Sequence, residues 1–186
     1  QGPPEYPTHR FLRKAGTIMK KAALVLAVAL LTFAGSYRIA LSHCEIPCGI
    51  YGDMTRITLL SEHITTVEKS MKVITDLSSK SSKSALDVNQ IVRWVDNKEE
   101  HCNKIQHIVT QYFMTQRVKP ADEANAAAYR KYLKQLTTLH AMLQSAMKAK
   151  QTTDLAHIES LRKQVKDFSA AYLTPKDLEH LNEHHD

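Results

Sequence analysis

The stretch that decides the fold is MTRITLLSEHITTVEKSMKVITDLS, which spans residues 54–78. Its apolar residues recur at alternating steps of three and four positions, which is the period of one face of an α-helix. A helix with one apolar face is stable only when that face is buried, so this stretch predicts a long helix against a helical core. The face consists of Ile57, Leu60, Ile64, Val67, Met71 and Ile74.

Three further stretches with the same period follow. A Ser/Lys-rich segment at 78–84 separates the first two, Pro120 ends the second, N-cap residues at 152–154 precede the fourth, and Pro175 ends the fourth. We predict helices over about 86–117, 121–149 and 154–172, and a short terminal helix over about 176–184. The predicted class is therefore all-α, an up-and-down four-helix bundle. The apolar faces consist of Ile91, Trp94, Val95, Lys98, Cys102, Ile105, Val109 and Tyr112 in the second helix, Tyr129, Leu133, Leu136, His140, Leu143 and Met147 in the third, and Leu155, Ile158, Leu161, Val165, Phe168 and Tyr172 in the fourth.

Residues 1–42 have the pattern of a cleavable secretory leader. Basic residues follow Met19, and an apolar run extends from Ala22 to Ala34. A bilayer span takes about 20 residues, whereas the apolar part of a signal peptide takes roughly 7–15. We predict a leader over 1–42, with 1–18 upstream of a start at Met19, and one domain over 43–186. Two alternatives remain: cleavage after Ser36, and a leader retained as a membrane anchor.

The charge of the chain argues against a nucleic-acid partner. The formal net charge is +6, but residues 1–42 hold six basic residues and one acidic residue, which leaves 19 basic and 18 acidic residues over 43–186. The excess charge therefore belongs to the predicted leader, and no basic stripe with interleaved aromatic residues follows it. A membrane partner is expected only through the leader.

The segment HCEIPCGIY at 43–51 carries the chemistry. Cleavage before His43 would create an α-amine next to the amide nitrogen and the thiol of Cys44, and these three groups can form two fused chelate rings around one metal ion. Cys48 supplies a second thiolate, and the imidazole of His43 remains as an axial ligand. Such a planar set of two nitrogens and two sulfurs suits Ni(II) or Cu(II) and suits tetrahedral zinc poorly. Pro47 and Gly49 favour the return of the chain.

The pattern His-Cys-x-x-Pro-Cys-Gly-x-Tyr resembles the N-terminal nickel hook of the nickel superoxide dismutase family. Further similarity to the family extends over Asn89–Arg93, Lys98–Glu100, Lys119-Pro120 and 129–154. The resemblance implies a four-helix-bundle subunit, commonly a homohexamer, that disproportionates superoxide to dioxygen and hydrogen peroxide with a nickel ion. It implies metal ligation by His43, Cys44 and Cys48, and a place for Tyr51 beside the access to the metal. We expect an exported protein, periplasmic or extracellular, or a membrane-anchored one if the leader is retained.

The sequence departs from the family pattern at positions around the hook. Glu45 replaces an aspartate, and Gly52-Asp53 replaces Asp-Pro. Thr58 or Leu59 stands where the family has a carboxylate that supports the axial imidazole, with Glu62 one turn later, and His101 stands in place of a supporting arginine. A less firmly held axial imidazole predicts a less efficient enzyme, because such outer partners orient the ligands of a metal.

Other interpretations of the same residues remain open. Cys44 and Cys48 can form a disulfide in an oxidising compartment, or Cys44 can carry a lipid. The alternative function is a non-enzymatic, secreted or membrane-tethered helical bundle that binds metal. We expect Cys102 and Met147 in the core.

For four other features the sequence predicts as follows. His140 packs in the core or at an interface, and Met142 lies beside the core. The charged run Lys98–Glu100 forms a solvated face, and Lys119 lies near the entrance for an anionic substrate.

Overall fold

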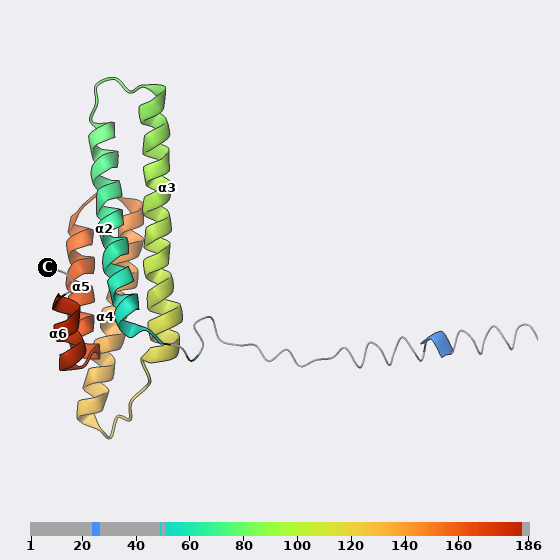
Figure 1. The fold of residues 1–186 in the computed structure, drawn as a ribbon, viewed down its shortest axis with the longest axis vertical. Helices are drawn as coiled ribbons and strands as arrows, with labels where there is room; N and C mark the ends of the chain where they lie inside the picture. The colour runs from blue at the N-terminus through green and yellow to red at the C-terminus, as the bar shows by residue number, and fades with distance from the viewer. Residues whose placement is uncertain (1–23, 27–48, 50, 184–186) are drawn as a thin grey trace, which may run out of the picture. The chain divides into compact units, whose positions relative to one another are not determined.

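The computed structural model describes residues 24–26, 49 and 51–183 (Figure 1). Residues 24–26 are helical, and the rest of the predicted leader lies outside the described residues. From residue 51 onward the described chain contains helices and no strand, so the predicted all-helical class is confirmed. The elements are α2 (Asp53–Ser78), α3 (Ala85–His107), the π-helix η1 (Ile108–Arg117), α4 (Ala126–Gln151), α5 (Ala156–Tyr172) and α6 (Pro175–Glu183).

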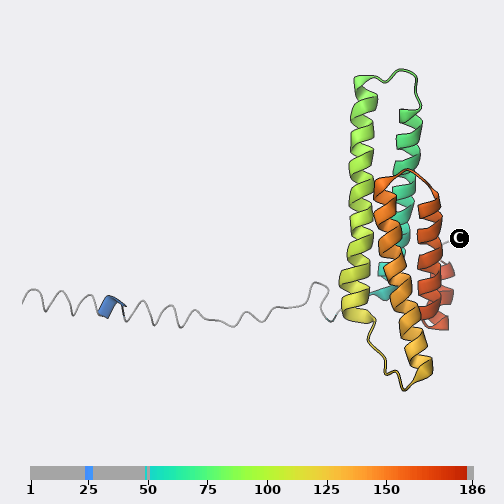
Figure 2. The same ribbon diagram turned by 180° about the vertical axis from the view of Figure 1, so that it is seen from behind.

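Four long helices lie side by side and run in alternating directions, as Figures 1 and 2 show. α2 contacts α3 and α5, and α4 contacts the same two helices, so each of the four has two neighbours. The connection between α2 and α3 projects beyond the connection between α4 and α5 (Figure 2). The ends of the helices follow sequence signals: Ser84 and Asp87 form a reciprocal capping box at the start of α3, and Asn125 caps α4.

The predicted face of α2 is confirmed, because all six of its residues are buried. The predicted face of α4 is wrong in part, although Leu143 of that face packs against the core. His140 is exposed, and Leu133 and Met147 are 38% and 39% exposed, whereas Met142 is fully buried. The true buried face is rotated by about one residue and is built mainly from small or hydrogen-bonded residues: Gln135, Thr138, Leu139, Met142, Ser145, Ala146 and Ala149.

Polar residues can occupy the buried face of α4 because their hydrogen bonds are made inside the protein. Gln135 donates to the carbonyl of Ala171 at 2.9 Å, and Gln164 of α5 donates to the hydroxyl of Ser145 at 3.0 Å. Small buried side chains such as Ala146 allow α4 to pack closely against its neighbouring helices. A hydrophobicity pattern alone assigns the larger leucines to the core and misses this face.

Candidate functional site

The metal-binding residues predicted from the sequence, His43, Cys44 and Cys48, lie outside the described residues. The structure describes Gly49 and Tyr51 of the same segment. Gly49 has a φ of 75°, in the left-handed region that a side chain disfavours. This agrees with the conformational reason for a glycine directly after Cys48, and it predicts strain for any other residue there.

Tyr51 is held by two side chains of η1. Its ring meets the ring of Tyr112 edge to face, with 6.1 Å between the centroids, and the guanidinium carbon of Arg117 lies 4.2 Å from its centroid. The latter is within the range of a cation–π interaction. The Tyr51 side chain is nevertheless 44% exposed. The residue that the family resemblance puts beside the metal access is therefore fixed in position but open to solvent.

The carboxylate of Asp53 collects hydrogen bonds from three side chains, and we call these four residues the Asp53 cluster. Tyr112 donates from its hydroxyl at 2.6 Å, Tyr172 from its hydroxyl at 2.8 Å, and Arg117 from Nε and Nη2 at 2.8 and 2.7 Å. Two-point pairing of a guanidinium with a carboxylate is among the stronger polar interactions in proteins. The cluster joins the first turn of α2 to η1 and to the last residue of α5.

Burial and charge shift the pKa values within the Asp53 cluster in a consistent way. Burial alone would raise the pKa of Asp53, but the hydrogen bonds from Arg117, Tyr112 and Tyr172 outweigh it and hold that pKa below its usual value. Burial, together with the bond to Asp53, raises the pKa of Tyr172 to about 12 and raises that of Tyr112 as well. At neutral pH the cluster therefore contains a carboxylate, a guanidinium and two protonated phenols.

The π-helical form of η1 explains why Tyr112 and Arg117 reach the same carboxylate. Residues five apart on an α-helix point about 140° away from one another, whereas hydrogen bonds from residue i+5 to residue i place them nearly one above the other. The backbone N–H of Val118 donates to the carbonyl of Phe113, five residues earlier, at 2.8 Å, in keeping with the π-helical pattern of η1. The sequence predicts an ordinary α-helix here, and its hydrophobic spacing gives no sign of the π-helix.

An aromatic group lies beneath the Asp53 cluster. Phe113 of η1 meets Phe168 and Tyr172 of α5 edge to face, at centroid distances of 4.8 and 5.5 Å, and those two rings stack on each other at 5.1 Å. Phe113 and Phe168 are fully buried. The cluster is thus supported by the core, which fixes the end of the bundle where Tyr51 lies.

His63 of α2 and His101 of α3 form a second polar contact between helices, the histidine pair. Their Nδ1 atoms are 3.2 Å apart, and their rings lie 4.9 Å apart at 81°. Burial lowers the pKa of His63, as does the nearby charge of His101; burial and then Lys104 lower the pKa of His101. Both imidazoles are therefore neutral at neutral pH. The sequence had singled out His101, but not its partner.

Lys98 is buried, which agrees with its place on the predicted apolar face of the second helix and corrects the prediction that the whole run Lys98–Glu100 is a solvated face. Its ammonium group donates to the carbonyls of Ala149 and Thr152 at 3.1 Å each, and also to that of Lys150. A cation at this place satisfies the unpaired carbonyls at the end of α4 and opposes the helix dipole. Glu100 is exposed as predicted.

Cys102 is fully buried, as predicted, and burial raises the pKa of its thiol to about 11. A thiol that stays protonated at neutral pH is a poor nucleophile and a poor metal ligand. Within the described residues no group of three or more His, Cys, Asp or Glu side chains is arranged to hold a metal ion. In the same part of the chain no helix is long and apolar enough to cross a membrane.

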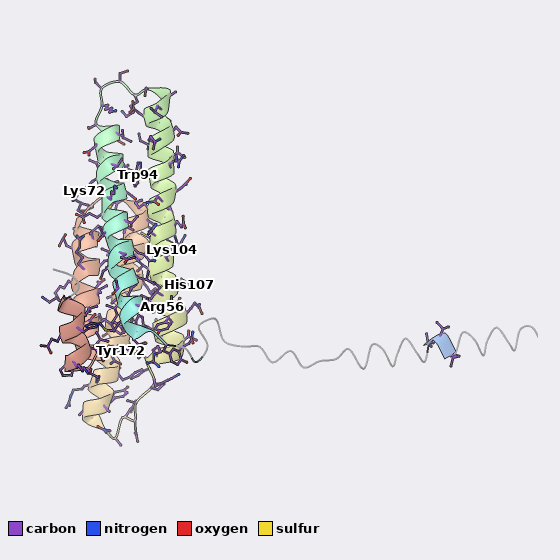
Figure 3. All side chains as sticks on the ribbon, in the orientation of Figure 1. Arg56, Lys72, Trp94, Lys104, His107 and Tyr172 are labelled. Atoms are coloured by element: carbon purple, nitrogen blue, oxygen red, sulfur yellow. The ribbon has the colours of Figure 1, made fainter. Side chains whose placement is uncertain are left out.

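A polar cleft of about 440 Å³ opens beside the Asp53 cluster. It is lined by both charged members of the cluster and by two exposed lysines, Lys119 and Lys131. Lys119 thus lies in one cleft with Arg117, whose guanidinium covers the ring of Tyr51. Figure 3 marks the place of the cluster through Tyr172, near the start of α2.

The model of the nickel-containing superoxide dismutase family matches residues 38–176. The chain belongs to the nickel-containing superoxide dismutases. It is therefore an oxidoreductase with a nickel cofactor and with superoxide as its substrate. The matched range contains segment 43–51, the Asp53 cluster and the histidine pair. No curated protein matches the chain, and no solved structure does.

Proposed function

We propose that the chain, once cleaved before His43, disproportionates superoxide at a nickel site built from its new N-terminus. The amine and imidazole of His43, the amide nitrogen and thiolate of Cys44 and the thiolate of Cys48 would hold the metal. The family match carries this proposal, because its range begins before His43 and includes the whole segment. Amine, amidate and two thiolates are a donor set that suits Ni(II).

The reaction converts two superoxide ions and two protons into one dioxygen and one hydrogen peroxide. Nickel, when bound, supplies the one-electron cycling between Ni(II) and Ni(III). In this proposal Tyr51 borders the access to the site, and the stacked guanidinium of Arg117 and the edge of Tyr112 hold its ring in place. The cationic side of the neighbouring cleft, with Lys119 and Lys131, raises the arrival rate of an anionic substrate.

The proposed architecture has a leader over 1–42, a hook from His43, and an up-and-down four-helix bundle. The alternating directions and the pairwise packing of α2, α3, α4 and α5 support the bundle. The leader, with export to the periplasm or the exterior, rests on the sequence pattern alone. Mass spectrometry of the mature protein tests it: a first residue of His43 agrees with the proposal, and a retained leader contradicts it.

We also propose that the enzyme assembles as a homohexamer, with α3 contributing to a subunit contact. Apolar side chains follow the solvent side of α3 at Leu86, Val88, Val92 and Val95, with exposures of 67, 51, 55 and 37%. Val92→Lys should reduce the assembled mass in analytical ultracentrifugation, whereas Gln144→Lys on the exposed side of α4 should not. Equal masses for both variants would remove α3 from the contact.

The activity itself is tested by loading nickel into the chain that begins at His43. After reduction and addition of one equivalent of Ni(II), superoxide decay is followed directly by its absorbance. We expect fast decay with Ni(II), no decay with Zn(II), and no decay in Cys48→Ser. Bound nickel without superoxide decay would favour the metal-binding bundle as the function.

A further inference from the structure

The histidine pair has chemistry that the proposed dismutase site does not use. His63 and His101 come from two different helices, 38 positions apart in the chain, and their Nδ1 atoms meet at 3.2 Å. This distance equals the upper end of the range for N–H···O hydrogen bonds, so it is compatible with a hydrogen bond between the two rings. When both rings are neutral, one Nδ1 must carry the proton and the other must accept it, so a single proton lies between the two rings.

A metal ion can take the place of that proton with little movement of the protein. Two imidazole nitrogens bound to one tetrahedral ion, at about 2.0–2.1 Å each, are separated by about 3.3–3.4 Å. The observed 3.2 Å is shorter than this by about 0.1–0.2 Å. Both residues belong to the long packed helices α2 and α3, so the two donors are already in position before an ion arrives.

Charges of both signs and an open cleft surround the pair. Glu62 and Glu100 are the carboxylates that act on His63, and Lys104 is the cation that opposes them while forming an ion pair with Glu100 at 2.6 Å. An open cleft of about 440 Å³ lies beside His63, and its polar lining consists of Arg56, His63, Glu100, Asn103, Lys104 and His107. The cleft has room for the water molecules that complete the coordination of an ion held by two imidazoles.

We propose that His63 and His101 form a second metal site, separate from the hook, which binds a divalent transition-metal ion between α2 and α3. Imidazole donors suit Cu(II), Ni(II) and Zn(II), and a given nitrogen site binds Cu(II) most tightly among these. The ion would link the two helices and would stabilise the folded state, because the unfolded chain does not hold the two rings together.

The test uses the full chain with Cys44→Ser and Cys48→Ser, so that the thiolates of the hook do not compete for the metal. Cu(II) and Zn(II) are titrated by calorimetry into this chain and into versions that also carry His63→Ala, His101→Ala or His140→Ala. His140, an exposed histidine of α4, is the matched control, and all versions keep the C-terminal histidines.

We expect one ion to be lost, or bound at least about tenfold more weakly, in both His63→Ala and His101→Ala, with no change in His140→Ala. Zn(II) should raise the melting temperature of the parent chain and not that of the two variants. In the electron paramagnetic resonance spectrum of Cu(II), coupling to two imidazole nitrogens should disappear with either histidine. Circular dichroism verifies folding, and His63→Gln and His101→Gln replace any variant that fails to fold.

Equal affinity and stoichiometry in all four chains would overturn the proposal and would leave the pair as a ring contact. The proposal would also fail if His63→Ala left Cu(II) binding intact in this background but changed nickel binding in the chain with its cysteines. That result would make the pair a support for the hook. The first outcome is measured in chains that lack both thiolates, so it does not depend on whether the dismutase proposal is correct.

Discussion

The Asp53 cluster connects α2 to η1 and α5, and the histidine pair connects α2 to α3, but the two contacts use opposite chemistry. In the cluster one carboxylate meets a guanidinium and two phenols, so that charges and donors complement one another. In the pair, ten residues further along α2, two rings of the same kind share one contact. In the cluster the charged and polar groups pair with one another without a ligand, whereas in the proposal above the two imidazoles bind a metal ion between them. We therefore assign the cluster to positioning and the pair to binding.

The largest effect is expected from Asp53→Asn, which leaves Arg117 without its counterion and removes acceptors for Tyr112 and Tyr172. Hydrogen bonds to charged groups contribute about 1.5–3 kcal/mol each when buried, and partial exposure of this cluster reduces that value. We expect a loss of about 2 kcal/mol in the free energy of unfolding in urea. Asp76→Asn, at an exposed position of the same helix, should change it by less than about 0.5 kcal/mol. An equally small loss for Asp53→Asn would show that the cluster does not hold the end of the bundle.

The contribution of Asp53 to stability should depend on pH in the acid range. The folded state lowers the pKa of Asp53, so its contribution is complete above the unfolded value near pH 4 and is lost as the pH falls through the folded value. The stability difference between the wild-type chain and Asp53→Asn should therefore shrink as the pH falls below about 4. A difference that stays constant down to pH 2 would contradict the assigned role of the carboxylate.

Alkaline titration acts through the phenols of the same cluster. The folded state raises the pKa of Tyr172 to about 12, so its contribution is complete below the unfolded value near 10 and is lost as the pH rises towards 12. The wild-type chain should lose stability between pH 10 and 12 as Tyr172 ionises, and Tyr172→Phe should lack this contribution to the loss. Denaturation curves across this range measure it, and identical slopes for both chains would remove Tyr172 from the titrating network.

A smaller effect is expected from Arg117→Lys, which keeps the charge but removes the planar, two-point contact with Asp53 and the stacking on Tyr51. We expect a loss of about 1 kcal/mol in stability, together with a weaker near-ultraviolet circular dichroism signal from Tyr51. Subtraction of the spectra of Tyr51→Phe versions assigns that signal. If the Tyr51 signal is unchanged, the guanidinium does not fix the ring.

The smallest effect is expected from Lys119→Ala, because this exposed side chain acts on the substrate only through its charge. Superoxide decay should slow by about two- to threefold at low ionic strength, and the salt dependence of the rate should decrease. Stability should not change. An unaltered rate and salt dependence would remove Lys119 from the attraction of the substrate.

The sequence predicted buried residues correctly where the apolar residues follow a simple helical period. The face of α2, the buried Cys102 and the prolines that end helices needed only hydrophobic spacing and backbone chemistry. It failed on α4, because the core there accepts hydrogen-bonded Gln135 and small Ala146 in place of larger leucines. It placed Lys98 on the apolar face of its helix as well as in a solvated charged run, and it could not identify the partners of Lys98, which are carbonyls 51 to 54 positions away.

For segment 43–51 the sequence predicts metal-ligating chemistry, but it does not predict the contacts that hold the neighbouring Tyr51. The donors in segment 43–51 could be inferred because neighbouring residues in the chain form the chelate. Arg117, Tyr112 and Tyr172 could not, because a π-helix and a tertiary approach bring them to Asp53. His63 reaches His101 only through the packing of α2 on α3, so its role also required the structure.

The most direct test of the central claim compares two nickel-loaded chains that differ by one residue in front of His43. The account predicts fast superoxide decay by the chain that begins at His43 and loss of that activity when one residue precedes it, since the free amine is then displaced from the metal. Both chains should give the same circular dichroism and the same stability, because the Asp53 cluster is unaffected. Equal activity in the two chains would contradict the claim that the new N-terminus is a ligand.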